Sequence, residues 1–93
     1  MEDKITKEKL EKYFSLSQKA FDIAKKSVIK ERKEEADKII EMVSCYLSDA
    51  KFFEKNGDYV NAFAAINYAH GWIDSGARLG IFDVKDTKLF TIK

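Results

Sequence analysis

The sequence predicts an all-α fold, an antiparallel up-and-down bundle of three helices followed by a short C-terminal tail. The 93 residues include no proline, the residue that most strongly interrupts a helix. Apolar residues recur three and four positions apart over three stretches, which is the period of one helical face. Gly57 and Gly80 follow the second and third stretches, and glycine is common just beyond a helix C-terminus.

Composition predicts a single cytoplasmic domain over residues 1–93. The hydrophobic content of 45% is sufficient for a core, and the formal net charge of +1 gives no reason to expect a nucleic-acid or acidic-membrane partner. The single cysteine, Cys45, excludes an intramolecular disulfide and favours a reducing compartment. We expect neither a signal peptide nor a membrane span, because the first residues include acids and no apolar segment approaches the ~20 residues that cross a bilayer.

The first helix is predicted over residues 4–28, with Thr6 as its N-cap. Leu16 and Ile23 lie off its main apolar face and form a second, smaller contact strip, which is consistent with a homodimer. The main face consists of Leu10, Tyr13, Phe14, Ser17, Ala20, Phe21, Ala24 and Val28.

The second helix is predicted over residues 31–56, after a turn near residues 27–30 where the apolar phase breaks. One long helix bent by tertiary contacts is the alternative. Gly57 ends the second helix and Asp58 N-caps the third, so almost no loop remains and the two helices should form a tight hairpin. The expected facing pairs are Phe53 with Ala62, Ala50 with Ile66, Tyr46 with Ala69, and Ile39 with Gly76.

The third helix, predicted over residues 58–79, is apolar on most sides, which is typical of a central helix covered by two neighbours. Gly71 and Gly76 lie in its interior, where each is less favourable than alanine by about 1 kcal/mol. Close packing of a neighbour's aromatic side chain is the expected compensation.

The C-terminal tail, residues 81–93, is rich in apolar residues. Its first part should fold back on the bundle through Ile81, Phe82 and Val84. Its last part needs a partner, either in the same molecule or in another one, because terminal segments are loose unless they dock. The residues concerned are Leu89, Phe90 and Ile92, which join Trp72 as candidate interaction residues.

The second half of the chain contains a dense motif of aromatic, small and charged residues. It consists of Tyr46, Asp49, Ala50, Phe53, Gly57, Asp58, Tyr59, Ala62, Ala65, Tyr68, Ala69, Gly71, Trp72, Asp74, Gly76, Arg78 and Gly80. This motif resembles that of a family of short archaeal proteins known only as domain of unknown function number three-five-seven. The resemblance implies a three-helix bundle and an archaeal cytoplasmic setting, with no assigned activity. Ser75 departs from the alanine of that pattern, and the pattern does not require His70.

The main candidate site is a polar stripe on the third helix, formed by Asn67, His70, Asp74 and Arg78, which share one face. In a functional interpretation, His70 and Asp74 form an acid–base pair and Arg78 holds an anionic group. In the structural interpretation, the stripe is an ion-pair network in which Arg78 reaches Glu34 or Glu35.

Two further polar features have structural interpretations. Asp49 lies on or near the apolar face of the second helix, where we expect a buried carboxylate with Tyr68 or Trp72 as donor. A basic run could contact a nucleic-acid backbone, but neighbouring acids and the absence of interleaved aromatic residues favour a solvated turn. That run comprises Lys25, Lys26, Lys30, Arg32 and Lys33.

We therefore predict a non-catalytic protein-interaction or scaffolding module, whose partner is another protein or a second copy of the chain. A metal or cofactor is not expected, because His70 and Asp74 lack the further ligands that zinc requires. The alternatives are a small ligand-binding or enzymatic domain that uses the polar stripe and a nucleic-acid accessory domain that uses the basic run. An exposed apolar patch, an open polar cleft or a contiguous basic surface would respectively support the three hypotheses.

Overall fold

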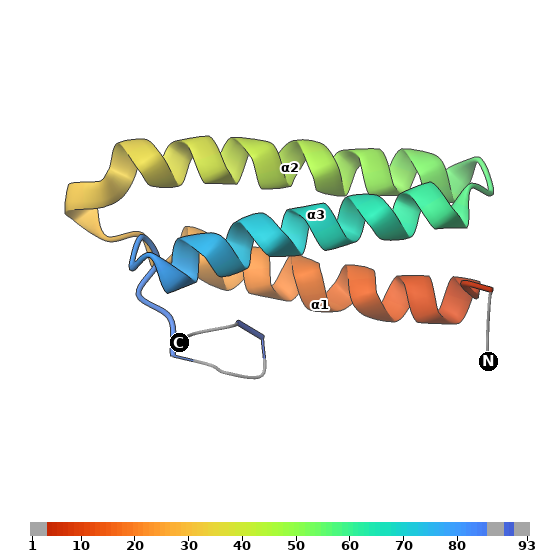
Figure 1. The fold of residues 1–93 in the computed structure, drawn as a ribbon, viewed down its shortest axis with the longest axis horizontal. Helices are drawn as coiled ribbons and strands as arrows, with labels where there is room; N and C mark the ends of the chain where they lie inside the picture. Colours follow the sequence, from red (N-terminus) through yellow and green to blue (C-terminus); the bar gives the residue numbers. More distant parts are fainter. Residues whose placement is uncertain (1–3, 86–88, 91–93) are drawn as a thin grey trace.

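Three long helices run antiparallel in chain order and confirm the predicted bundle (Figure 1). The computed structural model describes residues 4–85 and 89–90. The helices are α1 (Lys7–Lys25), α2 (Lys33–Lys55) and α3 (Tyr59–Arg78), and a 3-10 turn, η1 (Lys30–Arg32), precedes α2. In Figure 1, α3 lies between α2 and α1, and it packs against both, whereas α1 and α2 touch each other much less. The third helix is therefore the central one, as its apolar circumference predicts.

Side-chain caps set where α1 and α3 begin. The Thr6 hydroxyl accepts a hydrogen bond from the Lys9 amide at 3.1 Å, so α1 begins later than the predicted residue 4. The Asp58 carboxylate accepts one from the Asn61 amide at 3.2 Å and begins α3. Both caps satisfy amide donors that have no partner within the helix.

Two turns separate the helices. The chain leaves α1 at Lys25, and a loop then leads to η1, which confirms the predicted turn over the alternative of one bent helix. Between α2 and α3, Gly57 adopts φ 76°, a left-handed conformation that glycine accepts without a steric penalty. Only residues 56–58 connect these helices, as the hairpin prediction requires.

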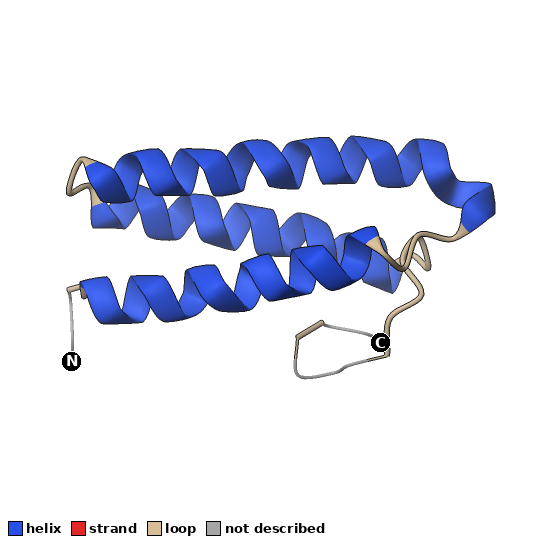
Figure 2. Ribbon diagram, turned by 180° about the vertical axis from the view of Figure 1, so that it is seen from behind, coloured by secondary structure: helices blue, strands red, loops and turns tan. Residues whose placement is uncertain are grey.

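The first part of the tail pairs with the loop that follows α1, and the two segments lie side by side in the view from behind (Figure 2). The Ile29 amide donates to the Ile81 carbonyl at 3.0 Å, and the Asp83 amide donates to the Ser27 carbonyl at 2.7 Å. Between these bonds, Val28 and Phe82 form an isolated antiparallel bridge. The predicted return of the tail onto the bundle is confirmed for this segment.

The two glycines inside α3 have different surroundings. A Cβ atom on Gly76 would lie 2.7 Å from Cδ2 of Phe82 and 3.2 Å from Cδ1 of Ile39, so aromatic packing explains this glycine as predicted. A Cβ on Gly71 would meet nothing within 4 Å, so the same prediction is wrong at that position. Gly71 faces open space rather than a neighbouring side chain.

The core extends from the middle of the bundle into the tail. Leu89 and Phe90 are buried and belong to the same cluster as the apolar residues of all three helices. Docking within the molecule therefore accounts for these two residues, which corrects their candidacy as exposed contacts. Ile92 lies outside the described residues. Other buried members of this cluster include Ala20, Phe21, Ala36, Ile39, Val43, Leu47, Ala69, Ile73, Ile81 and Phe82.

Candidate functional site

His70 connects three parts of the chain through the two nitrogens of its ring. Its Nδ1 lies 3.0 Å from the Ser17 hydroxyl on α1, and its Nε2 lies 2.9 Å from the Leu89 carbonyl in the tail. A carbonyl oxygen only accepts, so Nε2 must carry the proton that makes this bond. In the neutral ring, Nδ1 then accepts from the Ser17 hydroxyl. We call this Ser17–His70–Leu89 arrangement the His70 bridge.

The His70 bridge explains a polar residue in the core. Ser17 is only 2% exposed, and its hydroxyl needs a partner because a buried polar group without one is costly. Asp74 is a more distant neighbour, with 3.7 Å between its Oδ1 and the ring Nε2, which is longer than a hydrogen bond. The proton on Nε2 therefore points to a backbone carbonyl, and the contacts of the ring are those of a structural connector.

A cleft of about 430 Å³ lies beside the His70 bridge, between α1 and α3. It brings together three members of the predicted polar stripe, whereas Arg78 is exposed and does not line it. The sequence analysis did not identify the α1 side as part of a site. The available signal was Ser17, a polar residue on the otherwise apolar face of α1, since a buried hydroxyl requires a hydrogen-bond partner on a neighbouring element. This α1–α3 cleft is lined by Tyr13, Leu16, Ser17, Ile66, Asn67, His70, Gly71, Asp74 and Leu89.

The predicted burial of Asp49 and Tyr68 is wrong. Asp49 is exposed, because each helical residue advances by about 100° and this position lies well away from the face centred on Val43 and Leu47. Tyr68 is 63% exposed, and its ring stacks on Tyr46 of α2 with centroids 5.5 Å apart. Tyr46, expected to face Ala69, thus meets the preceding residue of α3.

A surface with exposed aromatic side chains lies on the solvent side of α3, and the exposed Arg78 follows it one turn after Ser75. The centre of this surface is a shallow depression of about 330 Å³ lined by Asn67, Tyr68, Gly71, Trp72 and Ser75. Trp72 is 39% exposed, and the exposed apolar residues Val60 and Leu79 lie near the two ends of the helix. We call these seven residues the outer face of α3.

The basic run at the turn between α1 and α2 is largely paired with neighbouring acids. Lys25 contacts Asp22 at 3.5 Å, and Lys33 contacts Asp37 at 2.8 Å. Arg32 forms a two-pronged contact with the Glu35 carboxylate, through Nε at 2.5 Å and Nη2 at 3.1 Å. These pairings reduce the positive potential that a nucleic-acid backbone would require.

Arg32 also joins the turn to the end of α3. Its Nη1 donates to the Leu79 carbonyl at 3.2 Å, and a cation is favourable at the C-terminal end of a helix. Hydrogen bonding from Arg32, followed by the attraction of the Arg32 and Lys38 charges, lowers the pKa of the Glu35 carboxyl. The partner for Glu35 in this structure is therefore Arg32, a residue that the sequence analysis assigned to the basic run.

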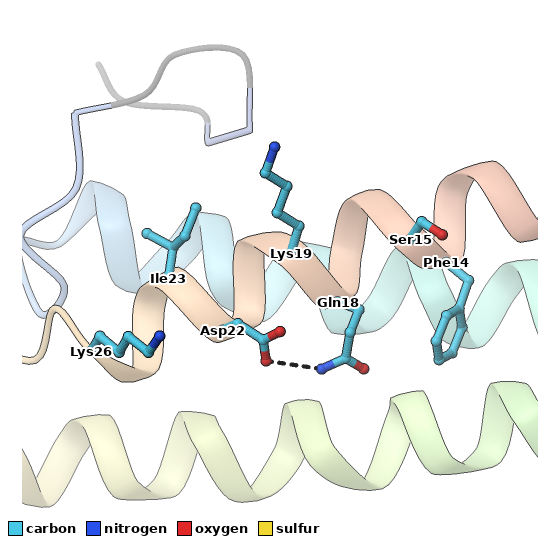
Figure 3. A pocket seen from close by; sticks show the side chains of 7 residues that line it. All are labelled: Phe14, Ser15, Gln18, Lys19, Asp22, Ile23 and Lys26. Carbon is cyan, nitrogen blue, oxygen red and sulfur yellow. Dashed lines mark hydrogen bonds between the residues drawn. The ribbon is translucent and has the colours of Figure 1, made fainter.

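A second depression, of about 410 Å³, follows one side of α1 (Figure 3). Two of its polar side chains bond to each other, since the Gln18 amide donates to the Asp22 carboxylate at 3.1 Å. Because a single helix and its cap supply the whole lining, this α1 depression has no opposing wall. The lining residues are Phe14, Ser15, Gln18, Lys19, Asp22, Ile23 and Lys26.

Residues 4–85 and 89–90 contain neither a metal-binding cluster nor a membrane-spanning helix. Within this part of the chain, no three His, Cys, Asp or Glu side chains gather closely enough to hold a metal ion. None of the helices described there combines the length and the apolar character needed to cross a membrane.

The fold and its surfaces define a small three-helix bundle protein whose one histidine connects two helices to a docked tail. The chain belongs to the family described as Protein of unknown function (DUF357), whose family model matches residues 12–82. This match confirms the family resemblance and includes α1 from Lys12 onward, both other helices and the tail as far as Phe82. No curated protein and no solved structure matches the chain.

Proposed function

We propose that the protein is a non-catalytic interaction module whose contact surface is the outer face of α3. The observation that carries the proposal is the exposure of aromatic side chains there, with Tyr68 63% and Trp72 39% exposed and no charged side chain among the five residues that line the central depression. Apolar patches on a protein surface mark interaction sites, and Trp and Tyr are the residues that most often anchor a partner.

We further assign a second copy of this chain as the partner. The residues that line the central depression carry no formal charge and so meet their own copy without like-charge repulsion, and a two-fold dimer places the same patch on both sides of the contact. The face extends along a helix of 20 residues, a length of about 30 Å, which suits a pair of helices packed along their axes. Gly71 lets a second backbone approach α3 closely, because it carries no side chain.

The position of Trp72 gives a direct test of self-association. It is the only tryptophan of the chain, so its emission reports this face alone. As the protein concentration rises, sedimentation equilibrium should show the mass doubling, and Trp72 emission should shift to shorter wavelength over the same range. Acrylamide should quench the dimer less than the monomer, because association removes the indole from water.

Two matched substitutions locate the interface. Tyr68→Glu should weaken self-association at least about tenfold, because it places two carboxylates opposite each other in the contact. Phe52→Glu is the control: Phe52 of α2 is also an aromatic residue and is 64% exposed, but it lies outside the outer face of α3. Circular dichroism would verify that both variants keep the wild-type helix content.

A protein that stays monomeric throughout the concentration series would contradict the second copy as partner. Equal weakening by the two substitutions would contradict the outer face as the interface. If the monomer's Trp72 emission instead shifts on addition of an amphipathic helical peptide, the face accepts a foreign helix.

The proposal also places this module in the cytoplasm, in line with one exposed cysteine, Cys45, and no second cysteine.

A further inference from the structure

We propose that the α1–α3 cleft binds a small aromatic cation, a flat ring that carries an amidinium or ammonium group. The cleft shares Asn67 and Gly71 with the outer face of α3, whereas its other walls come from α1, the remaining α3 residues and Leu89. Its volume of about 430 Å³ lies within the range of roughly 300–1,000 Å³ that is usual for small-molecule sites.

The cleft has walls of different character. On the α1 side, Tyr13 and Leu16 present large apolar side chains that are still more than a third exposed. On the α3 side, Asn67 and Asp74 supply polar groups. A ring held between these walls would cover the exposed apolar surface and turn its polar substituent toward α3.

Gly71 provides a second and separate observation. A glycine inside a helix is unfavourable relative to alanine, and Gly76 shows the packing reason that usually compensates for it. Close packing does not explain the glycine at position 71, because a Cβ there would meet nothing within 4 Å. It lines the cleft, so the missing side chain leaves space where a bound molecule can approach the backbone of α3.

The charge of the ligand follows from the lining. Among the described residues that line the cleft, Asp74 is the one with a formal charge at neutral pH, and a carboxylate has acceptor capacity for several hydrogen bonds at once. The His70 ring is already engaged through both nitrogens and offers no further donor to an anion. The Tyr13 ring, which also packs edge-to-face with Phe63 at a centroid distance of 5.3 Å, would attract a cation placed within about 6 Å of its face.

The test uses three probes of one shape and different charge: benzamidine, benzamide and benzoate. The full-length protein, labelled with nitrogen-15, is titrated with each probe, and amide chemical shifts locate the binding. We expect saturable benzamidine shifts at the residues of the α1–α3 cleft, weaker binding of benzamide and weakest binding of benzoate. Benzoate binding as tightly as benzamidine, or shifts scattered away from the cleft, would overturn the proposal.

Matched carboxylate substitutions test whether the negative charge of Asp74 is the one that attracts the cationic probe. Asp74→Asn should weaken benzamidine binding about fivefold and leave benzamide binding unchanged, since it removes a partly exposed charge and keeps the side-chain shape. Asp22→Asn is the control, because Asp22 lies in the α1 depression and not in the cleft. Equal effects of the two substitutions would contradict a site at Asp74.

A third variant separates this inference from the proposed function. Tyr68→Glu disrupts the outer face of α3 but does not line the cleft. Its benzamidine binding should match the wild-type value even though self-association is lost. Loss of both in this variant would show that the probe recognises the dimer contact, which would overturn the cleft as an independent site.

Discussion

Gly76 and Gly71 lie five positions apart in α3 and give opposite expectations for the same substitution. Gly76→Ala should reduce the free energy of unfolding by about 1–3 kcal/mol, because the new methyl group overlaps the Phe82 ring and overpacking outweighs the gain in helix propensity. Gly71→Ala should increase it by about 0.5–1 kcal/mol, because the helix gains propensity and nothing is displaced.

Urea unfolding of the two alanine variants beside the wild-type protein checks this prediction. Circular dichroism is the appropriate signal, since both positions are helical. Similar free energies of unfolding for the two variants would show that Phe82 does not pack on Gly76 as described.

At the scale of single residues, the sequence predicted which residues share a helical face but not what each of them contacts. The stripe of Asn67, His70 and Asp74 was found because helical spacing alone brings these residues together. The partners of His70 could not be found in this way, since Ser17 is 53 positions away and the other acceptor is a backbone carbonyl. Asp49 was misplaced because one step along a helix is enough to move a side chain from the core edge into water.

The helices themselves were predicted well because their apolar faces are long and regular. The boundaries shifted by a few residues where local hydrogen bonds decide them, as at Thr6, or where a 3-10 turn replaces the expected first turn of α2. The pairing of the tail with the loop after α1 depends on backbone groups and leaves no periodic signal in the sequence.

Arg32, the last residue of η1, contacts Glu35 of α2 and the Leu79 carbonyl at the end of α3, and the contact with Glu35 leads to a pH-dependent prediction. The folded-state pKa of Glu35 lies below its ordinary value of 4.5, so its pairing stabilises the protein above that value. The contribution is lost as the pH falls through the lower folded-state pKa, and it is small because both side chains are exposed. Carbon-13 NMR of the Glu35 carboxyl should therefore give a midpoint below 4.5.

The variant Arg32→Met supplies the comparison for that titration. Without the guanidinium, the pKa of Glu35 should rise toward its ordinary value, because the largest cause of its lowering is removed. An unchanged midpoint in this variant would contradict the described contact between Arg32 and Glu35.

For the molecule as a whole, the tail is part of the core and not an appendage. Phe90 is 2% exposed among residues of the helices, and Phe90→Ala should reduce the free energy of unfolding by about 3–5 kcal/mol. That is a large part of the roughly 5–15 kcal/mol by which a domain is stable. Phe52→Ala, at an exposed position, should stay within about 0.5 kcal/mol of the wild-type value.

The same urea experiment measures both phenylalanine variants. Circular dichroism is preferable to tryptophan fluorescence, because Trp72 lies near the surface and reports the core indirectly. If the two substitutions had equal effects, the tail would not contribute to the stability of the bundle.

The His70 bridge holds the tail through a bond whose direction does not depend on the charge of the ring. If the imidazole takes up a second proton, Nδ1 becomes a donor, and the Ser17 hydroxyl can rotate to accept, since hydroxyls act in either direction. The bond from Nε2 to the Leu89 carbonyl keeps its polarity in both charge states. A histidine that bonded the tail through an accepting nitrogen would lose that bond when the nitrogen gained a proton, whereas Nε2 of His70 is a donor to the Leu89 carbonyl in either form of the ring.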